Sequence, residues 1–163
     1  MKTSANEVLT LAAKAARGAG APPGQAVEFG RAALCHLIAG RGEAALRAAL
    51  EALPEGPIVV LPVALAEIAE SGEEGIATGS LAAAPLVQSY LDALPYAVAR
   101  ESAGERLHVT LTLAAPNTVA RAYRVEMSDA LADHLSALAA RTYVPETDAS
   151  RRSGAGAGLT DND

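Results

Sequence analysis

Small side chains fill most of the apolar positions of this chain, and this limits how its core can pack. About a quarter of the 163 residues are alanine, whereas the chain has one Phe, four Tyr and no Trp. Each buried position therefore removes little apolar area from water. We expect a core of closely packed helices. The chain is long enough for one domain with a core of its own.

Apolar residues recur at helical spacing through the first half of the chain. Ser4 and Glu7 have the spacing of a capping box, and Gly18 can end the helix that follows them. Two prolines then open the next helical stretch. Three helices are expected here, over residues 5–17, 22–40 and 46–53.

The segment from Pro57 to Gly72 has two interpretations. Residues 58–61 are β-branched and apolar, like a short buried strand, whereas residues 62–70 have a helical pattern. We expect mostly helix. Beyond a glycine-containing loop, Pro85 can begin a short helix. Ser128 is placed to cap a last helix, with Asp129 near its positive end.

Between these helices the apolar period changes from helical to two. Leu107 to Leu113 alternate with His108, Thr110 and Thr112, as in a half-buried strand, and residues 96–102 and 121–127 fit as its partners. An antiparallel meander is the simplest arrangement. The sequence therefore predicts an α+β fold in which five or six helices pack on one face of a small, about three-stranded antiparallel sheet.

The apolar pattern ends near residue 141, so we expect a globular domain over residues 1–141 and a Gly- and Asp-rich C-terminal arm over residues 142–163. The composition of the arm predicts disorder. Its glycines, with Arg151 and Arg152, can hold an anion, and Asp161 to Asp163 can hold a hard cation. Docking on a second subunit or in the cleft of a partner enzyme is equally compatible.

Charge and cysteine content exclude several classes of protein. The net charge of -6 lacks the basic field that nucleic acids and anionic membrane surfaces require, so neither is an expected partner. Cys35, the single cysteine, cannot form an internal disulfide. No apolar stretch has the length of a signal sequence or a membrane span, so a cytoplasmic location is expected.

Catalytic and cofactor motifs are not recognisable in the sequence. Cys35 and His36 are neighbours on a predicted helix and project about 100° apart, so they do not form a dyad; we expect Cys35 in the core and His36 at its boundary. The three histidines and Cys35 lack the short spacings of zinc sites. No phosphate loop or dinucleotide fingerprint occurs. We therefore expect no catalytic residue, no metal site and no cofactor.

Both ends of the chain resemble a known family. The stretches AAKAARGAGAPPGQAVEFGRAA (residues 12–33) and RTYVPETDASRRSGAGAGLTDND (residues 141–163) are similar to the two ends of a family of small bacterial proteins known only as a domain of unknown function. The resemblance implies no activity, but it draws attention to certain positions. These are Arg17, Gly18, Gly20, Gly24, Glu28, Gly30, Arg31, Arg141, Tyr143, Pro145 and Arg151.

Two functions are compatible with this sequence. The first is a non-catalytic small-molecule-binding or accessory protein that forms homo-oligomers, or docks on a partner enzyme, through its C-terminal arm. The second is a small metal-independent enzyme acting on an organic anion held by arginines, with Glu28, His108 or Tyr143 transferring a proton. The polar face of the strand at His108 is a ligand surface or a solvated sheet face. The expected ligand-binding residues are Arg17, Glu28, Arg31, His108, Arg141, Tyr143 and Arg151.

Overall fold

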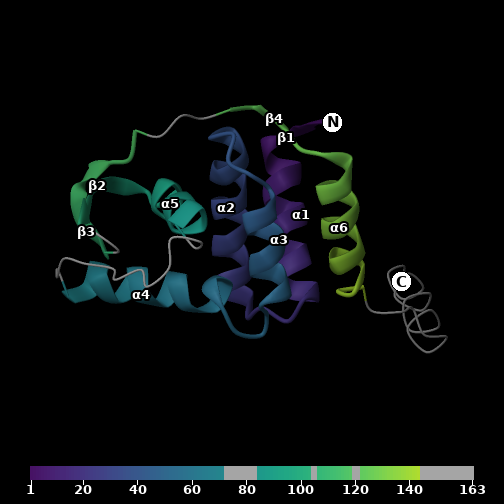
Figure 1. The fold of residues 1–163 in the computed structure, drawn as a ribbon, viewed down its shortest axis with the longest axis horizontal. Helices are drawn as coiled ribbons and strands as arrows, with labels where there is room; N and C mark the ends of the chain where they lie inside the picture. The colour runs from purple at the N-terminus through teal and green to yellow at the C-terminus, as the bar shows by residue number, and fades with distance from the viewer. Residues whose placement is uncertain (72–83, 104–105, 119–121, 144–163) are drawn as a thin grey trace, which may run out of the picture.

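The computed structural model describes residues 1–71, 84–103, 106–118 and 122–143. Within these ranges, six helices and four strands form an α+β fold, as the sequence predicts (Figure 1). Among the described residues, no helix combines the length and the apolar character needed to cross a membrane.

Three helices lie side by side and form the helical layer of the molecule. They are α1 (Ala5–Gly18), α2 (Pro23–Ile38) and α6 (Asp129–Ala140), and α1 packs between the other two (Figure 1). Gly30 of α2 allows close approach to α1, because a Cβ there would lie 2.6 Å from the carbonyl oxygen of Leu9. Gly18 does the same between α1 and α6, where a Cβ would overlap the backbone of Leu138. The small residues in the sequence thus permit the close helix packing that we expected.

Local capping explains where α1 and α6 begin. The Ser4 hydroxyl accepts from the Glu7 amide at 3.2 Å, while the Glu7 carboxylate accepts from the Ser4 amide at 2.9 Å, which confirms the capping box. The Ser128 hydroxyl accepts from the Leu131 amide at 3.0 Å. The Glu43 carboxylate, far away in sequence, accepts from both the Ser128 amide and the Ser128 hydroxyl. Glu43 therefore fixes the start of α6 to the loop that precedes the third helix.

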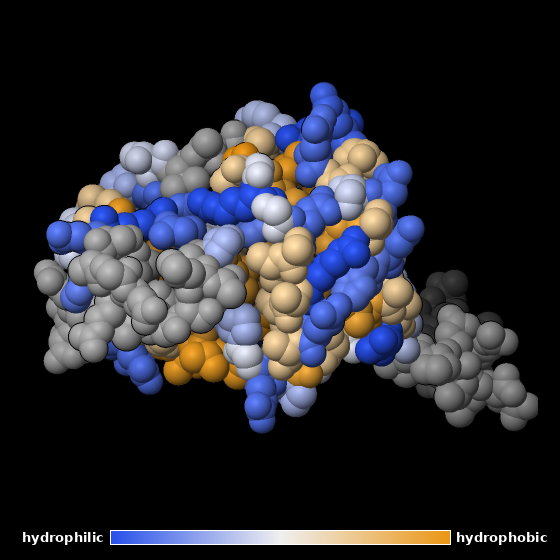
Figure 2. All heavy atoms as spheres, viewed as in Figure 1, coloured by the Kyte–Doolittle hydropathy of each residue, from blue (hydrophilic) through white to orange (hydrophobic). Residues whose placement is uncertain are grey.

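Three further helices complete the helical part of the molecule. They are α3 (Ala44–Glu51), α4 (Pro57–Ser71) and α5 (Ala84–Ala93), of which α5 packs on α2. The strand-like interpretation of residues 58–61 is wrong, because α4 is continuous from Pro57 and contains Pro62. Ile58, Leu61, Leu65 and Ile68 follow helical spacing and are buried, so the 3.6-residue period outweighs the β-branched composition. Apolar side chains gather along this edge of the surface, where Val60 and Val63 are exposed (Figure 2).

The strands form two separate two-stranded antiparallel sheets. β1 (Lys2–Ser4) pairs with β4 (Arg124–Glu126), and β2 (Tyr96–Ala103) pairs with β3 (Arg106–Pro116). The single meander expected from the sequence is therefore wrong in one respect: the third strand pairs with the N-terminal strand instead of with β3. The β1–β4 pair joins the starts of α1 and α6, so these helices run parallel (Figure 1).

One face of the β2–β3 hairpin is exposed to solvent. His108, Thr110 and Thr112 are exposed and Val109 is fully buried, as the alternation predicts. Leu113 departs from the expected pattern, because its side chain is 59 % exposed near the end of the strand. The hairpin lies at the end of the molecule next to α4 and α5, and β3 contacts α4 (Figure 1).

Candidate functional site

A cavity of about 640 Å³ opens beside α2, at the end of α5. Its walls come from α1, α2, the end of α5 with the turn that follows it, and the segment before β4. The lining residues are Leu9, Arg31, Leu34, Cys35, Ile38, Asp92, Ala93, Leu94, Pro95, Asn117, Ala122 and Tyr123. The volume lies within the range of small-molecule sites, which are typically apolar with a few polar groups. We take this cavity as the candidate functional site.

Arg31 supplies the cationic group of the cavity. Its guanidinium forms an ion pair with Glu28 at 2.8 Å, one turn earlier on α2. The two side chains are 53 % and 39 % exposed, so this pair is strongly screened by water and contributes little to stability. A guanidinium has five N–H donors and one of them meets Glu28, which leaves Arg31 able to bind a carboxylate at the cavity rim.

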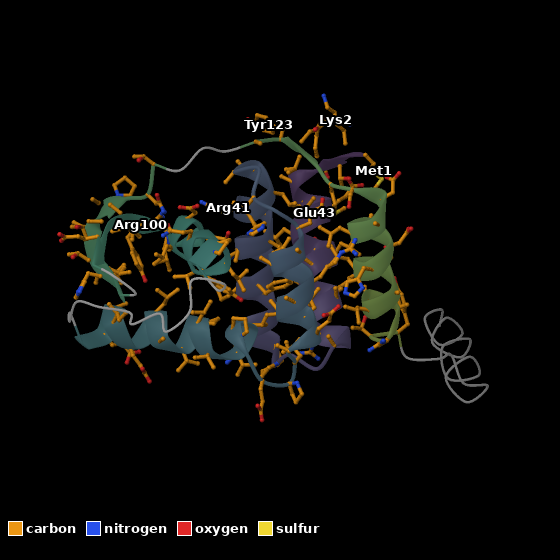
Figure 3. The ribbon with its side chains drawn as sticks, in the orientation of Figure 1. Met1, Lys2, Arg41, Glu43, Arg100 and Tyr123 are labelled. Atoms are coloured by element: carbon orange, nitrogen blue, oxygen red, sulfur yellow. The ribbon has the colours of Figure 1, made fainter. Side chains whose placement is uncertain are left out.

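Asp92 lines the same cavity but is already neutralised. Its carboxylate accepts from Arg41 at 2.6 Å and from Arg100 through its other oxygen, and only 8 % of the side chain is exposed. The two arginines approach α5 from opposite sides (Figure 3). Asp92 thus ties the turn after α2 and strand β2 to α5. With two cationic partners it offers little attraction to a further cation.

Asn117 closes the end of α5 next to the cavity. Its side-chain amide donates to the carbonyl of Leu94 at 2.9 Å and lies within 3.4 Å of the carbonyls of Leu91 and Asp92. They belong to the last turn of α5 and the turn that follows it, where helix carbonyls run out of intrahelical partners. The position of Asn117 is therefore fixed by the helix, and it forms a rigid polar wall of the cavity.

His36 is fully buried behind the cavity wall, which corrects the expectation that it lies at the core boundary. Its Nε2 lies 2.9 Å from the carbonyl of Gly42, which can only accept, so Nε2 carries the proton. Nδ1 lies 2.8 Å from the Ser89 hydroxyl, which is also 2.8 Å from the Pro85 carbonyl and 3.0 Å from Arg41. Burial lowers the pKa of His36, which favours the neutral ring. The His36–Ser89 pair therefore joins α2 to α5.

Cys35 faces the cavity instead of the core, which corrects the second expectation for this pair. It is partly exposed and lines the cavity wall. Burial, and after it the negative charge of Asp92, raise the pKa of the thiol. Cys35 is thus protonated near neutral pH and lacks the thiolate that a nucleophilic cysteine needs.

The sequence-predicted site residues fall into three separate places. Glu28 and Arg31 lie together on α2, and Arg31 lines the cavity. Arg17, Arg141 and Tyr143 are exposed at the ends of the parallel helices α1 and α6. His108 is exposed on β3, at the opposite end of the molecule from α6 (Figure 1). Arg151 lies outside the described residues.

The cavity could be found only in part from the sequence. The family resemblance draws attention to Arg31. No local sequence pattern marks Leu34, Asp92 or Asn117 as cavity residues. They meet because α5 packs across α2, which no spacing in the sequence encodes.

No family model matches this chain, and neither a curated protein nor a solved structure matches it. The resemblance of both chain ends to a bacterial family of unknown function therefore stays a prediction.

Proposed function

We propose that this protein binds a small amphipathic carboxylic acid in the cavity beside α2. The observation that carries the proposal is the composition of the cavity wall: a largely apolar space with a half-exposed guanidinium at its rim. The apolar part of the ligand packs against Leu34, Ile38 and Leu94. Its carboxylate binds Arg31 in place of, or beside, Glu28.

The charges around the cavity support an anion over a cation. Asp92 is the acidic residue of the wall, and it is held by two arginines. The weakly held group is Arg31, whose only partner in the described part of the chain is the partly exposed Glu28. An incoming carboxylate exchanges one screened ion pair for another, so the apolar contacts provide the net gain in free energy.

The titratable groups near the cavity support binding without chemistry. Cys35 is a protonated thiol, and His36 and Ser89 are buried in a network that fixes the helices. The enzyme alternative requires Glu28, His108 and Tyr143 to converge. These residues lie on α2, on β3 and after α6, and β3 and α6 are at opposite ends of the molecule.

Protection of Cys35 from alkylation tests this proposal directly, because the chain has one cysteine and it lines the cavity. The rate of reaction with iodoacetamide at mildly alkaline pH is measured with octanoate, octanol or octylamine present. These probes share an alkyl chain and differ in the charge of the head group. We expect octanoate to slow the reaction most.

A matched pair of arginine variants identifies the anchor. Arg31→Gln removes the guanidinium at the rim, and we expect it to weaken octanoate binding roughly tenfold, since a hydrogen bond to a charged group contributes about 1.5–3 kcal/mol. Arg17→Gln is the control, because Arg17 lies at the end of α1 and does not line the cavity. Equal protection by all three probes, or equal loss in both variants, would contradict the proposal.

A further inference from the structure

Tyr123 places an aromatic ring in solvent at the opening of the cavity beside α2. The residue is 97 % exposed, yet it lines that cavity together with Leu9, Ile38 and Ala122. A tyrosine ring has a large apolar face, and covering this face with another apolar group is favourable. The ring therefore has its apolar area available to a ligand in the cavity.

The backbone of Tyr123 is held in place on both sides. The Ala5 amide donates to the Tyr123 carbonyl at 3.0 Å. The next residue, Arg124, pairs with Ser4 in the β1–β4 sheet. The side chain is thus the part that can move onto a ligand. A tyrosine loses little conformational entropy when it is ordered, because it has two χ angles.

The cavity follows one face of α2 from Arg31 to Ile38. Leu34 and Cys35 lie between these two residues, and the spacings of three, four and seven positions place all four on the same side of the helix. Seven residues correspond to a rise of about 10 Å along the helix axis. The Arg31 guanidinium contacts Glu28, which lies on the side away from Ile38. The cationic group therefore lies at one end of this face, and the other end is apolar.

Tyr123 lies at the apolar end of this face. Helices α1 and α2 are joined by a short turn and run in opposite directions, and Gly30 faces Leu9 and Ala13 of α1. The start of α1 at Ala5, to which Tyr123 is bonded, is consequently level with the last turns of α2. Figure 3 shows Tyr123 on the segment beside these two helix ends. A ligand held by the guanidinium must extend along α2 to reach the Tyr123 ring.

We propose that the ligand of this cavity is a medium-chain carboxylate whose far end is covered by the ring of Tyr123. This inference rests on the function proposed above. The carboxylate binds Arg31, the tail lies along Leu34 and Ile38, and the ring packs on the end of the tail. With C–C bonds of about 1.5 Å, extended octanoate measures about 9 Å from carboxyl carbon to methyl group, and butanoate about 4 Å. Octanoate therefore spans the face from Arg31 to Ile38, whereas butanoate ends near Cys35.

The fluorescence of Tyr123→Trp tests this contact, because the chain has no Trp of its own. Its emission is measured with octanoate or butanoate, each added at the concentration that protects Cys35 from iodoacetamide to the same extent. We expect octanoate to shift the emission to shorter wavelength, since the indole leaves water, and butanoate to leave it unchanged. Tyr143→Trp is the control. Tyr143 is also exposed, at 71 %, but it does not line the cavity, so no shift is expected there.

Removing the ring measures its contribution to binding. In Tyr123→Ala, we expect the octanoate concentration that gives half of the maximal protection of Cys35 to rise about fivefold. The corresponding butanoate concentration is expected to stay the same. Tyr123→Phe keeps the ring and is expected to bind octanoate like the wild type, and Tyr143→Ala is the control. Protection is expressed relative to the alkylation rate of the same variant without ligand, so a change in access to Cys35 does not affect the comparison.

The outcomes separate this inference from the function on which it rests. If octanoate does not protect Cys35 in the wild type, both are overturned. If protection is unchanged in Tyr123→Ala and the emission of Tyr123→Trp does not shift, the contact at Tyr123 is overturned and the carboxylate site stands. Equal shifts in Tyr123→Trp and Tyr143→Trp show general adsorption of octanoate and also overturn the contact. A shift confined to Tyr123→Trp, with weaker octanoate binding by Tyr123→Ala, supports it.

Discussion

The hydroxyl of Tyr90 is buried without a hydrogen-bond partner among the residues that the structure describes. Burial, and after it the charge of Glu28, raise the pKa of this phenol, so it stays neutral. A buried hydroxyl without a partner costs about 1–3 kcal/mol. We therefore expect Tyr90→Phe to leave the free energy of unfolding in urea unchanged or to raise it by about 1 kcal/mol. A loss of that size would mean that a water or another residue bonds the hydroxyl.

His36 makes stability depend on pH in a defined direction. Burial, and more weakly the charge of Arg41, lower its folded pKa from the ordinary value of 6.5, against the opposing effects of the Gly42 hydrogen bond and, more weakly, of Glu43. Below about pH 6.5 the unfolded chain therefore binds a proton that the folded chain does not bind. The contribution of neutral His36 to stability is complete above that pH and is lost as the pH falls.

His36→Gln isolates this effect. We expect the wild type to be more stable than the variant at pH 7.5, and this difference in unfolding free energy to shrink at pH 5.5. Urea unfolding of both proteins at the two pH values measures it. A difference that stays constant with pH would show that His36 is not the titrating group.

Single residues also show where sequence reasoning ends. Cys35 and His36 are adjacent on α2, and their expected places in the core and at its boundary are reversed in the structure. Helical spacing gives the angle between two side chains, but it does not give which neighbour covers each of them. The helix that covers His36 is α5, which contributes Ser89 from 53 residues further along the chain.

The contact between α1 and α2 depends on one small residue. A Cβ at Gly30 would lie 2.6 Å from the Leu9 carbonyl oxygen and 3.0 Å from the Ala13 Cβ. Since both helices must then separate, we expect Gly30→Ala to lower the free energy of unfolding by about 2 kcal/mol. Gly24→Ala is the matched control on the same helix. It has open space around it, and the alanine is expected to stabilise the helix by up to about 1 kcal/mol.

Chemical denaturation of the two glycine variants measures this prediction. A destabilisation common to both would assign the effect to helix α2 as a whole. Gly30→Ala as stable as the wild type would show that the two helices have room to separate.

At the scale of elements, the sequence was most informative where the signal is local. The capping box at Ser4 and Glu7, the cap at Ser128 and the alternation around Val109 all predict what the structure contains. Each of these rests on residues within a few positions of one another. The pairing of β4 with β1 joins residues more than a hundred positions apart, and two strands of three residues carry too little pattern to predict it.

At the scale of the whole molecule, the candidate site arises from the crossing of elements. Its cavity is enclosed by α1, α2, the end of α5 and the segment before β4, so four distant parts of the chain contribute. Composition predicted close helix packing, but it did not predict where that packing leaves a hollow. In the sequence, Arg31 and Asp92 are both charged residues of predicted helices. Only the fold shows that the Arg31 guanidinium is exposed and available to a ligand, whereas the buried Asp92 carboxylate is neutralised by arginines.

Asp92 holds the turn after α2 and strand β2 to α5, and its removal should loosen the hairpin more than the helical layer. Its carboxylate holds Arg41, which follows α2, and Arg100 of β2 (Figure 3). Asp92→Asn keeps the shape and removes the charge, which leaves two arginines with a weaker partner. Both arginines are about a quarter exposed. We therefore expect Asp92→Asn to lower the free energy of unfolding by about 2 kcal/mol, which is less than the loss from breaking a fully buried ion pair.

Hydrogen exchange distinguishes local from global loosening in this variant. The hairpin β2–β3 lies at the periphery, and Arg100 is its charged link to α5, so its amides are expected to exchange faster in Asp92→Asn by local opening. The amides of α1 lie in the centre of the helical layer and exchange through global unfolding. In Asp92→Asn we therefore expect the exchange of the α1 amides to become faster only by the factor that corresponds to the loss in the free energy of unfolding. If the amides of α1 and of β2–β3 exchange faster by the same factor, the hairpin and the helical layer unfold as one unit. Asp92 would then stabilise the whole fold and not the attachment of one end.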